Sequence, residues 1–173
     1  APSATTQTTA VPSMTDAQPV LELRPVTLAN YYEVMKLEMA PGQERFLDSN
    51  AWPLAEAAYV TGFTPEAVYL DGTLIGLVSW GPYYPGYAYD EPPETGSLII
   101  DHVMIDQPHQ GMGLGRRLVT RLIDKLATRP DCRRIVLMLD PQNHIADRLY
   151  TSLGFTQFGV THEDDRLMAL DVA

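Results

Sequence analysis

The chain has 173 residues, of which 45% are apolar, and a formal net charge of −10 at pH 7. This length supports one hydrophobic core, and the longest apolar runs fall short of the roughly 20 residues that a membrane-spanning helix needs. The single cysteine, Cys132, excludes an internal disulfide framework and cannot by itself make a zinc site, and the acidic balance disfavours a nucleic-acid partner.

The first segment differs in composition from the rest. Residues 1–19 are built mainly from Ala, Ser, Thr, Pro and Gln without a helical or strand period, so we expect a disordered or leader segment there. Met14 is a candidate native start. Residues 20–173 are expected to form one domain, and no basic flank followed by an apolar stretch marks the chain for export, so we expect it in the cytoplasm.

The first half of this domain predicts a strand, short helices and a hairpin. Residues 20–26 alternate as a strand, and residues 27–39 have helical spacing with Thr27 as a candidate cap. Residues 43–60 predict one or two short helices interrupted near Pro53. Strands at 66–72 and 73–81 are joined by Asp71-Gly72, a strong hairpin signal, and a long loop rich in Tyr and Pro follows at 82–96.

The second half alternates strands and helices. Residues 97–106, "SLIIDHVMID", predict a buried central strand, and leucines recur every four residues from Leu114 to Leu126. A second buried strand at 133–140 precedes a helix at 143–155 that ends at Gly154, and strands at 155–160 and 166–172 close the chain. The order predicts an α/β fold, a single domain with a mixed central sheet of about six to seven strands flanked by helices.

A glycine-rich turn opens the first of these helices. Gly111, Gly113 and Gly115 do not match the spacing of a P-loop or of a dinucleotide fingerprint. They do free several backbone N–H groups at a helix N-terminus, where Arg116 and six further basic residues follow within 19 positions. Residues 1–115 have 3 basic and 14 acidic residues, whereas residues 116–173 have 9 and 8. The turn is therefore expected to bind a pyrophosphate.

Three segments together resemble the GNAT N-acetyltransferases. Residues 110–115, "QGMGLG", resemble the acetyl-CoA signature Gln/Arg-x-x-Gly-x-Gly/Ala, and Val103-Met104-Ile105 is similar to the strand that meets the pantetheine arm. Residues 143–155, with Asn143, Ala146 and Tyr150, are similar to the family's next helix. The resemblance covers roughly residues 20–172, and residues 43–57 with the strand end "VMID" are similar to bacterial spermine/spermidine acetyltransferases.

The resemblance implies an acetyl-CoA site with no metal. The residues that it assigns to the cofactor are Val103, Met104, Ile105, Gln110, Gly111, Met112, Gly113, Leu114, Gly115, Arg116, Asn143, Ala146 and Tyr150. Tyr150 is the expected acid for the departing thiolate, because its phenol has a proton to give. Its spacing from Ala146 places both residues on one side of the helix.

The proton acceptor has two candidates on the central strand. Strict alternation places Asp101 on one face with Val103 and Ile105, and His102 on the other with Met104, so at most one of them is expected to face the amine. We favour Asp101, as a carboxylate that steers cations or as a base acting through water, because an aspartate in an apolar strand is costly unless paired or hydrated. His102 remains an alternative because of its pKa of about 6.5.

The acidic first half also points to a cationic acceptor. Glu91 and Glu94 lie with Asp90 among the tyrosines of the 82–96 loop, a composition able to meet an ammonium. We expect transfer of the acetyl group of acetyl-CoA to a primary amine of a small cationic acceptor, most favourably a polyamine, by direct attack in a ternary complex. The alternatives are another amine (an aminoglycoside, an amino acid or a peptide N-terminus), a CoA-binding module without turnover, and a different nucleotide-binding domain. No membrane partner is expected, and a homodimer is left open.

Overall fold

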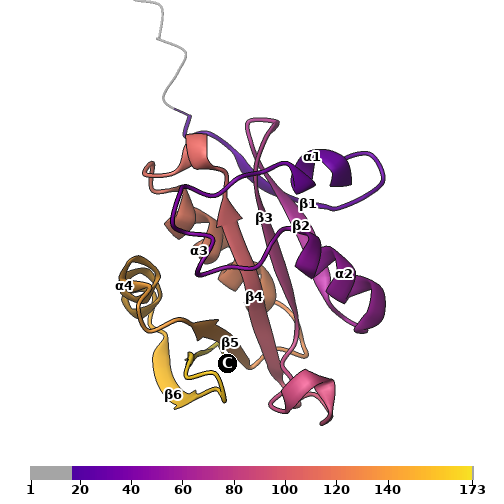
Figure 1. The fold of residues 1–173 in the computed structure, drawn as a ribbon, viewed down its shortest axis with the longest axis vertical. Coiled ribbons are helices and arrows are strands. Elements are labelled where there is room, and N and C mark those ends of the chain that lie inside the picture. Colours follow the sequence, from indigo (N-terminus) through magenta and orange to yellow (C-terminus); the bar gives the residue numbers. More distant parts are fainter. Residues whose placement is uncertain (1–16, 173) are drawn as a thin grey trace, which may run out of the picture.

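The computed structural model describes residues 17–172, in which one seven-stranded sheet runs through the whole domain (Figure 1). The strand order is β1-β2-β3-β4-β5-β7-β6, and every neighbouring pair is antiparallel except β4 and β5, which are parallel. The strands are β1 (Leu21–Pro25), β2 (Thr64–Leu70), β3 (Thr73–Pro82), β4 (Ser97–Ile105), β5 (Arg134–Leu139), β6 (Thr156–Val160) and β7 (Arg166–Asp171). The predicted α/β fold with a mixed central sheet is confirmed. Most of the predicted 1–19 segment lies outside the described residues.

Helices cover both faces of the sheet. They are α1 (Tyr31–Met35), α2 (Ala51–Tyr59), α3 (Leu114–Ala127) and α4 (His144–Ser152). The leucine stripe of α3, including the fully buried Leu118 and Leu122, packs in one core cluster with Ile100 of β4. Val34 of α1 packs in another cluster with Met104 of β4, so α1 lies on the opposite face from α3. Within residues 17–172, no helix is both long and apolar enough to cross a bilayer.

The central strands β4 and β5 separate along their length. They pair only over Ser97–Ile99 of β4 and Arg134–Val136 of β5. Beyond Ile99, β4 continues to Ile105 paired with β3 alone, while β5 stays paired with β7. The edge of β4 that faces β5 is therefore without a strand partner over Val103–Ile105, at the end of the sheet where the glycine turn follows.

One local expectation about the helices near the N-terminus is wrong. The regular part of helix α1 begins after Asn30, but Thr27 does cap the turn that leads into it. Its Oγ1 accepts the N–H of Ala29 at 3.2 Å, and its own N–H donates to Asn30 Oδ1 at 2.7 Å. Pro53 does not interrupt α2, because it lies in the first turn of the helix. Backbone N–H groups in that turn have no intrahelical partner, so a proline there costs no hydrogen bond. The predicted hairpin is confirmed, with Asp71 and Gly72 both at positive φ, as a type I′ turn requires.

A β-bulge in β4 overturns the predicted facing of its polar residues. Ser79 of β3 pairs with His102, but the next residue, Trp80, pairs with Ile100, so Asp101 is the extra residue of the bulge. Ile100 and Val103 face α3, and both residues between them turn toward α2. The expectation that Asp101 and His102 lie on opposite faces is therefore wrong, because strict alternation does not survive an inserted residue.

Candidate active site

The glycine turn lies between β4 and α3. After a single 3₁₀ turn at Gln107–His109, Gly111 (φ 75°) and Gly113 (φ 73°) adopt the left-handed conformation that glycine permits, and Gly113 caps α3. Gly115 is different, because it is helical and, apart from its chain neighbours and the nearby backbone of α3, no described atom lies within 4 Å of where its Cβ would be. No contact among residues 17–172 requires glycine at this position, so the missing side chain leaves room for a ligand at the N-terminus of α3. That terminus presents unpaired N–H groups and positive potential.

A polar network ties this turn to the segment 36–50, which connects α1 to α2. The side-chain NH₂ of Gln110 donates to the carbonyl of Ile105 at 2.8 Å and to Gln43 Oε1 at 2.9 Å. The backbone of Glu38 adds two bonds, one from its N–H to Asp106 Oδ1 at 2.8 Å and one to its carbonyl from the Gln107 N–H at 2.7 Å. The segment 36–50 therefore lies against the end of β4 and the start of the turn.

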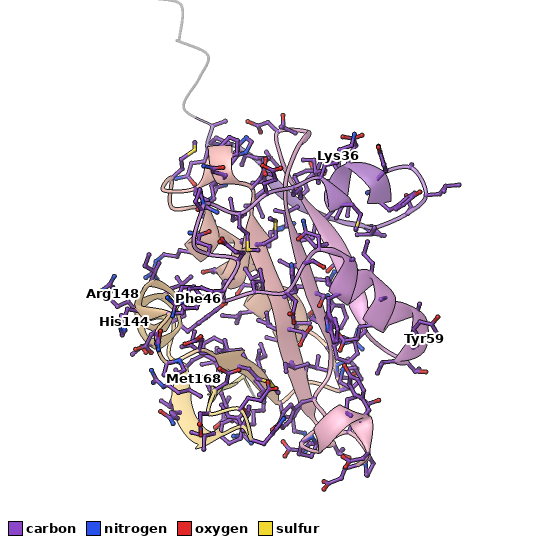
Figure 2. The ribbon with its side chains drawn as sticks, in the orientation of Figure 1. Lys36, Phe46, Tyr59, His144, Arg148 and Met168 are labelled. Atoms are coloured by element: carbon purple, nitrogen blue, oxygen red, sulfur yellow. The ribbon has the colours of Figure 1, made fainter. Side chains whose placement is uncertain are left out.

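The same segment reaches across the gap between β4 and β5. Arg45 hydrogen-bonds Gln142 in the loop between β5 and α4, and its guanidinium lies 4.8 Å from the ring centre of Phe46. In the view of Figure 2, Phe46 lies on the α4 side of β4. The segment therefore spans the open edge of β4 rather than lying over α2 alone.

Helix α4 presents Asn143 and Tyr150 two turns apart on one side. Asn143 caps the helix, its Oδ1 accepting the N–H of Ala146 at 3.2 Å, so its NH₂ is the part left for a ligand. The ring of Tyr150 packs edge-on against Phe155, 5.7 Å between centres, and its hydroxyl has no hydrogen-bond partner among the described residues. Burial raises the pKa of Tyr150 to about 12, so the phenol stays protonated at neutral pH.

Opposite this helix, the bulge brings Asp101 to α2. The carboxyl of Glu56 in α2 is hydrogen-bonded to Asp101, and Asp48 of the segment 36–50 acts on both. Burial, the Asp101 charge and that hydrogen bond, with a smaller effect of Asp48, raise the pKa of Glu56 to about 8. The pKa of Asp101 is raised as well, mainly by burial and further by the Asp48 charge. The hydrogen bond with Glu56 acts in the opposite direction and lowers it. The raised pKa keeps Glu56 largely protonated at pH 7, and the hydrogen bond between the two carboxyls favours the negative charge on Asp101.

The arrangement of elements around the turn is matched by known proteins. The family model of the acetyltransferase (GNAT) family covers residues 31–155, from α1 to the end of α4. The chain belongs to the GNAT acetyltransferase family. The spermine/spermidine N(1)-acetyltransferase of Bacillus subtilis strain 168 is 31% identical over 135 residues, which are 78% of this chain and 87% of that protein. Family members use acetyl-CoA, so this GNAT enzyme is an acetyl-CoA-dependent N-acetyltransferase.

Solved structures share the fold at low sequence identity. An aminoglycoside acetyltransferase in complex with coenzyme A superposes with a TM-score of 0.72 at 21% identity, covering 88% of this chain and 95% of that one. The spermidine N-acetyltransferase from Vibrio cholerae, in complex with CoA and spermine, has a TM-score of 0.67 at 21% identity and covers 87% and 95%. These likenesses establish the GNAT fold of the chain and leave its acceptor open.

His102, the alternative base of this GNAT domain, is 2% exposed. Its Nε2 lies 3.3 Å from Asn50 Oδ1, and the NH₂ of Asn50 donates to the carbonyls of Val34 and Leu37. Because the Asn50 oxygen is thereby the acceptor, Nε2 carries the hydrogen. Burial lowers the pKa of His102 to about 4, so the ring is neutral and anchors the start of α2. This environment favours a packing role for His102.

The acidic loop of the GNAT domain lies away from the turn. Its 3₁₀ turn, Tyr87–Tyr89, is at the opposite end of β4 from the glycine turn (Figure 1). Glu94 accepts a bond from Ser97 and pairs with Arg134 at 3.6 Å, while Glu91 is exposed. The role predicted for Glu91 and Glu94 stays a prediction, and Glu94 already has a cationic partner.

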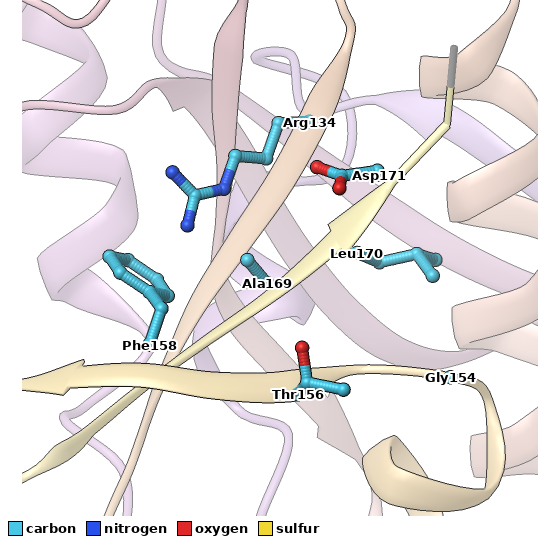
Figure 3. A pocket seen from close by; sticks show the side chains of 7 residues that line it. All are labelled: Arg134, Gly154, Thr156, Phe158, Ala169, Leu170 and Asp171. Carbon is cyan, nitrogen blue, oxygen red and sulfur yellow. The ribbon is translucent and has the colours of Figure 1, made fainter.

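A surface pocket at the other end of the sheet is separate from the turn. Figure 3 shows its lining side chains, contributed by β5, β6, β7 and the end of α4: Arg134, Gly154, Thr156, Phe158, Ala169, Leu170 and Asp171. Arg134 is the first residue of β5, whereas Asn143 follows the last. The pocket is therefore at the end of β5 that is remote from Asn143.

Sequence reasoning missed Glu56 and Asp48. A signal for Glu56 was present, because it shares the inward side of α2 with Pro53, Ala57 and Val60, where a charged residue is out of place. Its contact with Asp101 depends on the bulge, which the sequence did not reveal. The carboxyls do not form a metal site, since residues 17–172 contain no group of three His, Cys, Asp or Glu side chains that could hold a metal ion.

Proposed function

We propose that this enzyme transfers the acetyl group of acetyl-CoA to a primary amine of a small polycation, of the spermidine or spermine kind, by direct attack within a ternary complex. The observation that carries the proposal is the acidic side of the site, where Asp48, Glu56 and Asp101 act on one another. The similarity to a Bacillus spermine/spermidine N(1)-acetyltransferase supports the same acceptor class. A cationic acceptor gains from such a field, whereas an acidic one is repelled.

The other side of the site fits acetyl-CoA, which supplies an acetyl group activated as a thioester. The amides at residues 113–116 with Arg116 would hold the pyrophosphate, since the space beside Gly115 is open and Arg116 lies at the first turn of α3. The unpaired edge of β4 at Val103–Ile105 would hydrogen-bond the pantetheine arm, and the Asn143 NH₂ would donate from the other side of the gap.

Tyr150 is the group that we assign to the departing sulfur. Its hydroxyl has no hydrogen-bond partner within residues 17–172, and its pKa of about 12 keeps it a donor over the working pH range. A thiol has a pKa of about 8.5, so complete transfer of the phenolic proton alone would be uphill by about 3.5 pH units, roughly 5 kcal/mol. A hydrogen bond that strengthens as negative charge builds on sulfur is therefore its main contribution, with proton transfer coupled to proton loss from the nitrogen.

The amine must become neutral before it attacks, because a protonated nitrogen has no free electron pair. Asp101 is the carboxylate that we assign to the ammonium. It is on the strand that leads to the cofactor edge, two residues before Val103, and the hydrogen bond with Glu56 favours its charged form. His102, neutral and bonded to Asn50, is not assigned a chemical role.

The test is a thiol-release assay with acetyl-CoA and a panel of amines. Spermidine and spermine are compared with a monoamine, an aminoglycoside, a peptide N-terminus and an acidic amino acid, at low and high salt. We expect the polyamines to have the highest kcat/KM and their advantage to shrink as salt screens the carboxylates. Asp101→Asn should remove most activity, and Glu163→Gln, which removes an exposed carboxylate from the β6–β7 turn, serves as the control.

Each other outcome identifies one alternative. A better rate with an aminoglycoside or an amino acid would keep the acetyltransferase and discard the polyamine. Binding of CoA without thiol release from any amine would favour a module without turnover. The polyamine preference could also survive in Asp101→Asn and disappear in a Glu91→Gln, Glu94→Gln double variant. That result would place the acceptor site at the 82–96 loop.

A further inference from the structure

We propose that Glu56 and Asp101 work as a pair that accepts the proton which the acceptor ammonium must lose, with Asp101 contacting the ammonium and Glu56 holding the proton behind it. The inference rests on the proposed amine acetylation but not on which amine is acetylated. Asp101 is then the catalytic residue, and Glu56 is a positioning residue that acts through it.

The geometry of the pair comes from two elements. The β-bulge turns Asp101 out of the alternation of β4 and toward α2, and Glu56 projects inward from α2 onto it. One oxygen of Glu56, Oε2, is buried and receives no hydrogen bond from any described donor. An ionised carboxylate would leave that oxygen unsatisfied next to a second negative charge, whereas a protonated one donates a hydrogen bond to Asp101.

The described groups around the pair leave its proton in place. In α2 the only other titratable group is Tyr59, which is 90% exposed and points away from the sheet (Figure 2). On β4 the neighbour His102 is neutral, and β3 contributes only uncharged side chains opposite the bulge, those of Ser79 and Trp80. Asp48, from the segment 36–50, adds a further negative charge and favours the protonated pair.

The pair corrects a mismatch in proton affinity. An alkylammonium has a pKa of about 10, so a lone aspartate with a pKa of about 4 would take its proton with an equilibrium constant of roughly 10⁻⁶. The fully ionised pair takes up its first proton at about pH 8, the pKa of Glu56, which improves that constant to roughly 10⁻². A base whose pKa is close to the working pH is the efficient one.

The step balances as follows. The ammonium gives one proton to the ionised pair and becomes a neutral amine, whose electron pair forms the N–C bond to the acetyl carbon while the C–S bond breaks and sulfur keeps its electrons. The second nitrogen proton reaches sulfur by way of the Tyr150 hydroxyl, which ends protonated as it began. The pair then returns its proton to water, so the products are the amide, the thiol and one proton.

The experiment is a pH profile of kcat/KM from pH 5.5 to 10. Wild type is compared with Glu56→Gln and with Glu44→Gln, which removes an exposed carboxylate from the segment 36–50. Two acceptors are used, spermidine and a monoamine whose pKa is lower than that of spermidine but still above the pKa of the pair, so that both bind as ammonium ions. We expect the wild-type profile to rise to a plateau with a midpoint near pH 8 for both acceptors, since the midpoint belongs to the pair. Glu44→Gln should keep that midpoint.

Glu56→Gln should move the midpoint down by about two pH units or more and lower the plateau kcat by roughly 10- to 10³-fold, with the KM for acetyl-CoA unchanged. An unchanged midpoint in folded, active Glu56→Gln, or a wild-type midpoint that follows the pKa of the acceptor, would overturn the inference and leave the acetyltransferase intact. If no amine is acetylated, the proposed function fails. The pair is then tested by infrared titration, in which a protonated carboxyl band at pH 7 must be present in wild type and missing from Glu56→Gln.

Discussion

Replacing Glu56 by Gln is expected to change how the stability of the domain depends on pH. The substitution keeps the shape of the side chain and a donor toward Asp101, but removes the titration. In wild type the pKa of Glu56 is raised from 4.5 to about 8 on folding. Between these two values the folded chain holds a proton that the unfolded chain has lost, so the stability from this group is complete below about pH 4.5 and is lost as the pH rises through 8.

The size of the effect follows from that interval. A difference of about 3.5 pH units in pKa sets a ceiling of roughly 5 kcal/mol, at about 1.4 kcal/mol for each unit. Glu56 is only partly buried, and solvent screening reduces such electrostatic differences severalfold, so we expect about 1–2 kcal/mol. For a chain of this length that amounts to roughly 2–8 °C in Tm.

Thermal unfolding followed by circular dichroism at pH 5, 7 and 9 measures this. Wild type should lose stability between pH 5 and 9, Glu56→Gln should lose less, and the variant should be the more stable protein at pH 9. Glu44→Gln, an exposed change of the same kind, controls for the loss of one negative charge. Parallel curves for wild type and Glu56→Gln would show that Glu56 is not protonated in the folded enzyme and would refute the reasoning.

Three further predictions concern other parts of the fold. Gly113→Asp puts a carboxylate on a left-handed residue at the α3 N-terminus and should lower the affinity for CoA, measured by calorimetry, at least tenfold. Gly72→Asp, also at positive φ, should leave that affinity unchanged. Equal CoA affinities in the two variants would show that the turn is not part of the site. Tyr150→Phe should lower kcat by roughly 10- to 10⁴-fold at unchanged CoA affinity, and wild-type turnover would make Tyr150 a packing residue. Lys125→Met should lower the free energy of unfolding, measured in urea, by about 1–3 kcal/mol, because it removes the cationic partner of Glu66. Glu66 is 4% exposed and would keep only the hydrogen bond from Trp80 Nε1 at 2.8 Å, so an unchanged unfolding midpoint would contradict this.

Features set by neighbouring residues were predictable from the sequence. The Asp71-Gly72 hairpin and the Gly113 cap depend on backbone conformations that few residues tolerate, so the residue type reveals the turn. The four-residue spacing of the leucines in α3 predicted both the helix and the side of it that is buried. The GNAT resemblance likewise depended on short contiguous motifs.

Features set by distant pairing were not predictable. The bulge at Asp101 exists because β3 and β4 differ by one residue in register, and neither strand shows this alone. The partnership of Asp101 with Glu56 joins residues 45 positions apart and could be recognised only after α2 was placed on β4.

The bonds from the segment 36–50 to the glycine turn connect the two parts of the proposed site. Gln43 and Glu38 in that segment are bonded to Gln110, Asp106 and Gln107 at the turn. A ligand that shifts the turn therefore shifts the segment from which α2 and Glu56 continue. By thermodynamic reciprocity, whatever factor CoA applies to the affinity for the amine, the amine applies to the affinity for CoA. If the proposed sites are correct, we expect each substrate to change the affinity for the other, and we expect Gln43→Ala to weaken this coupling.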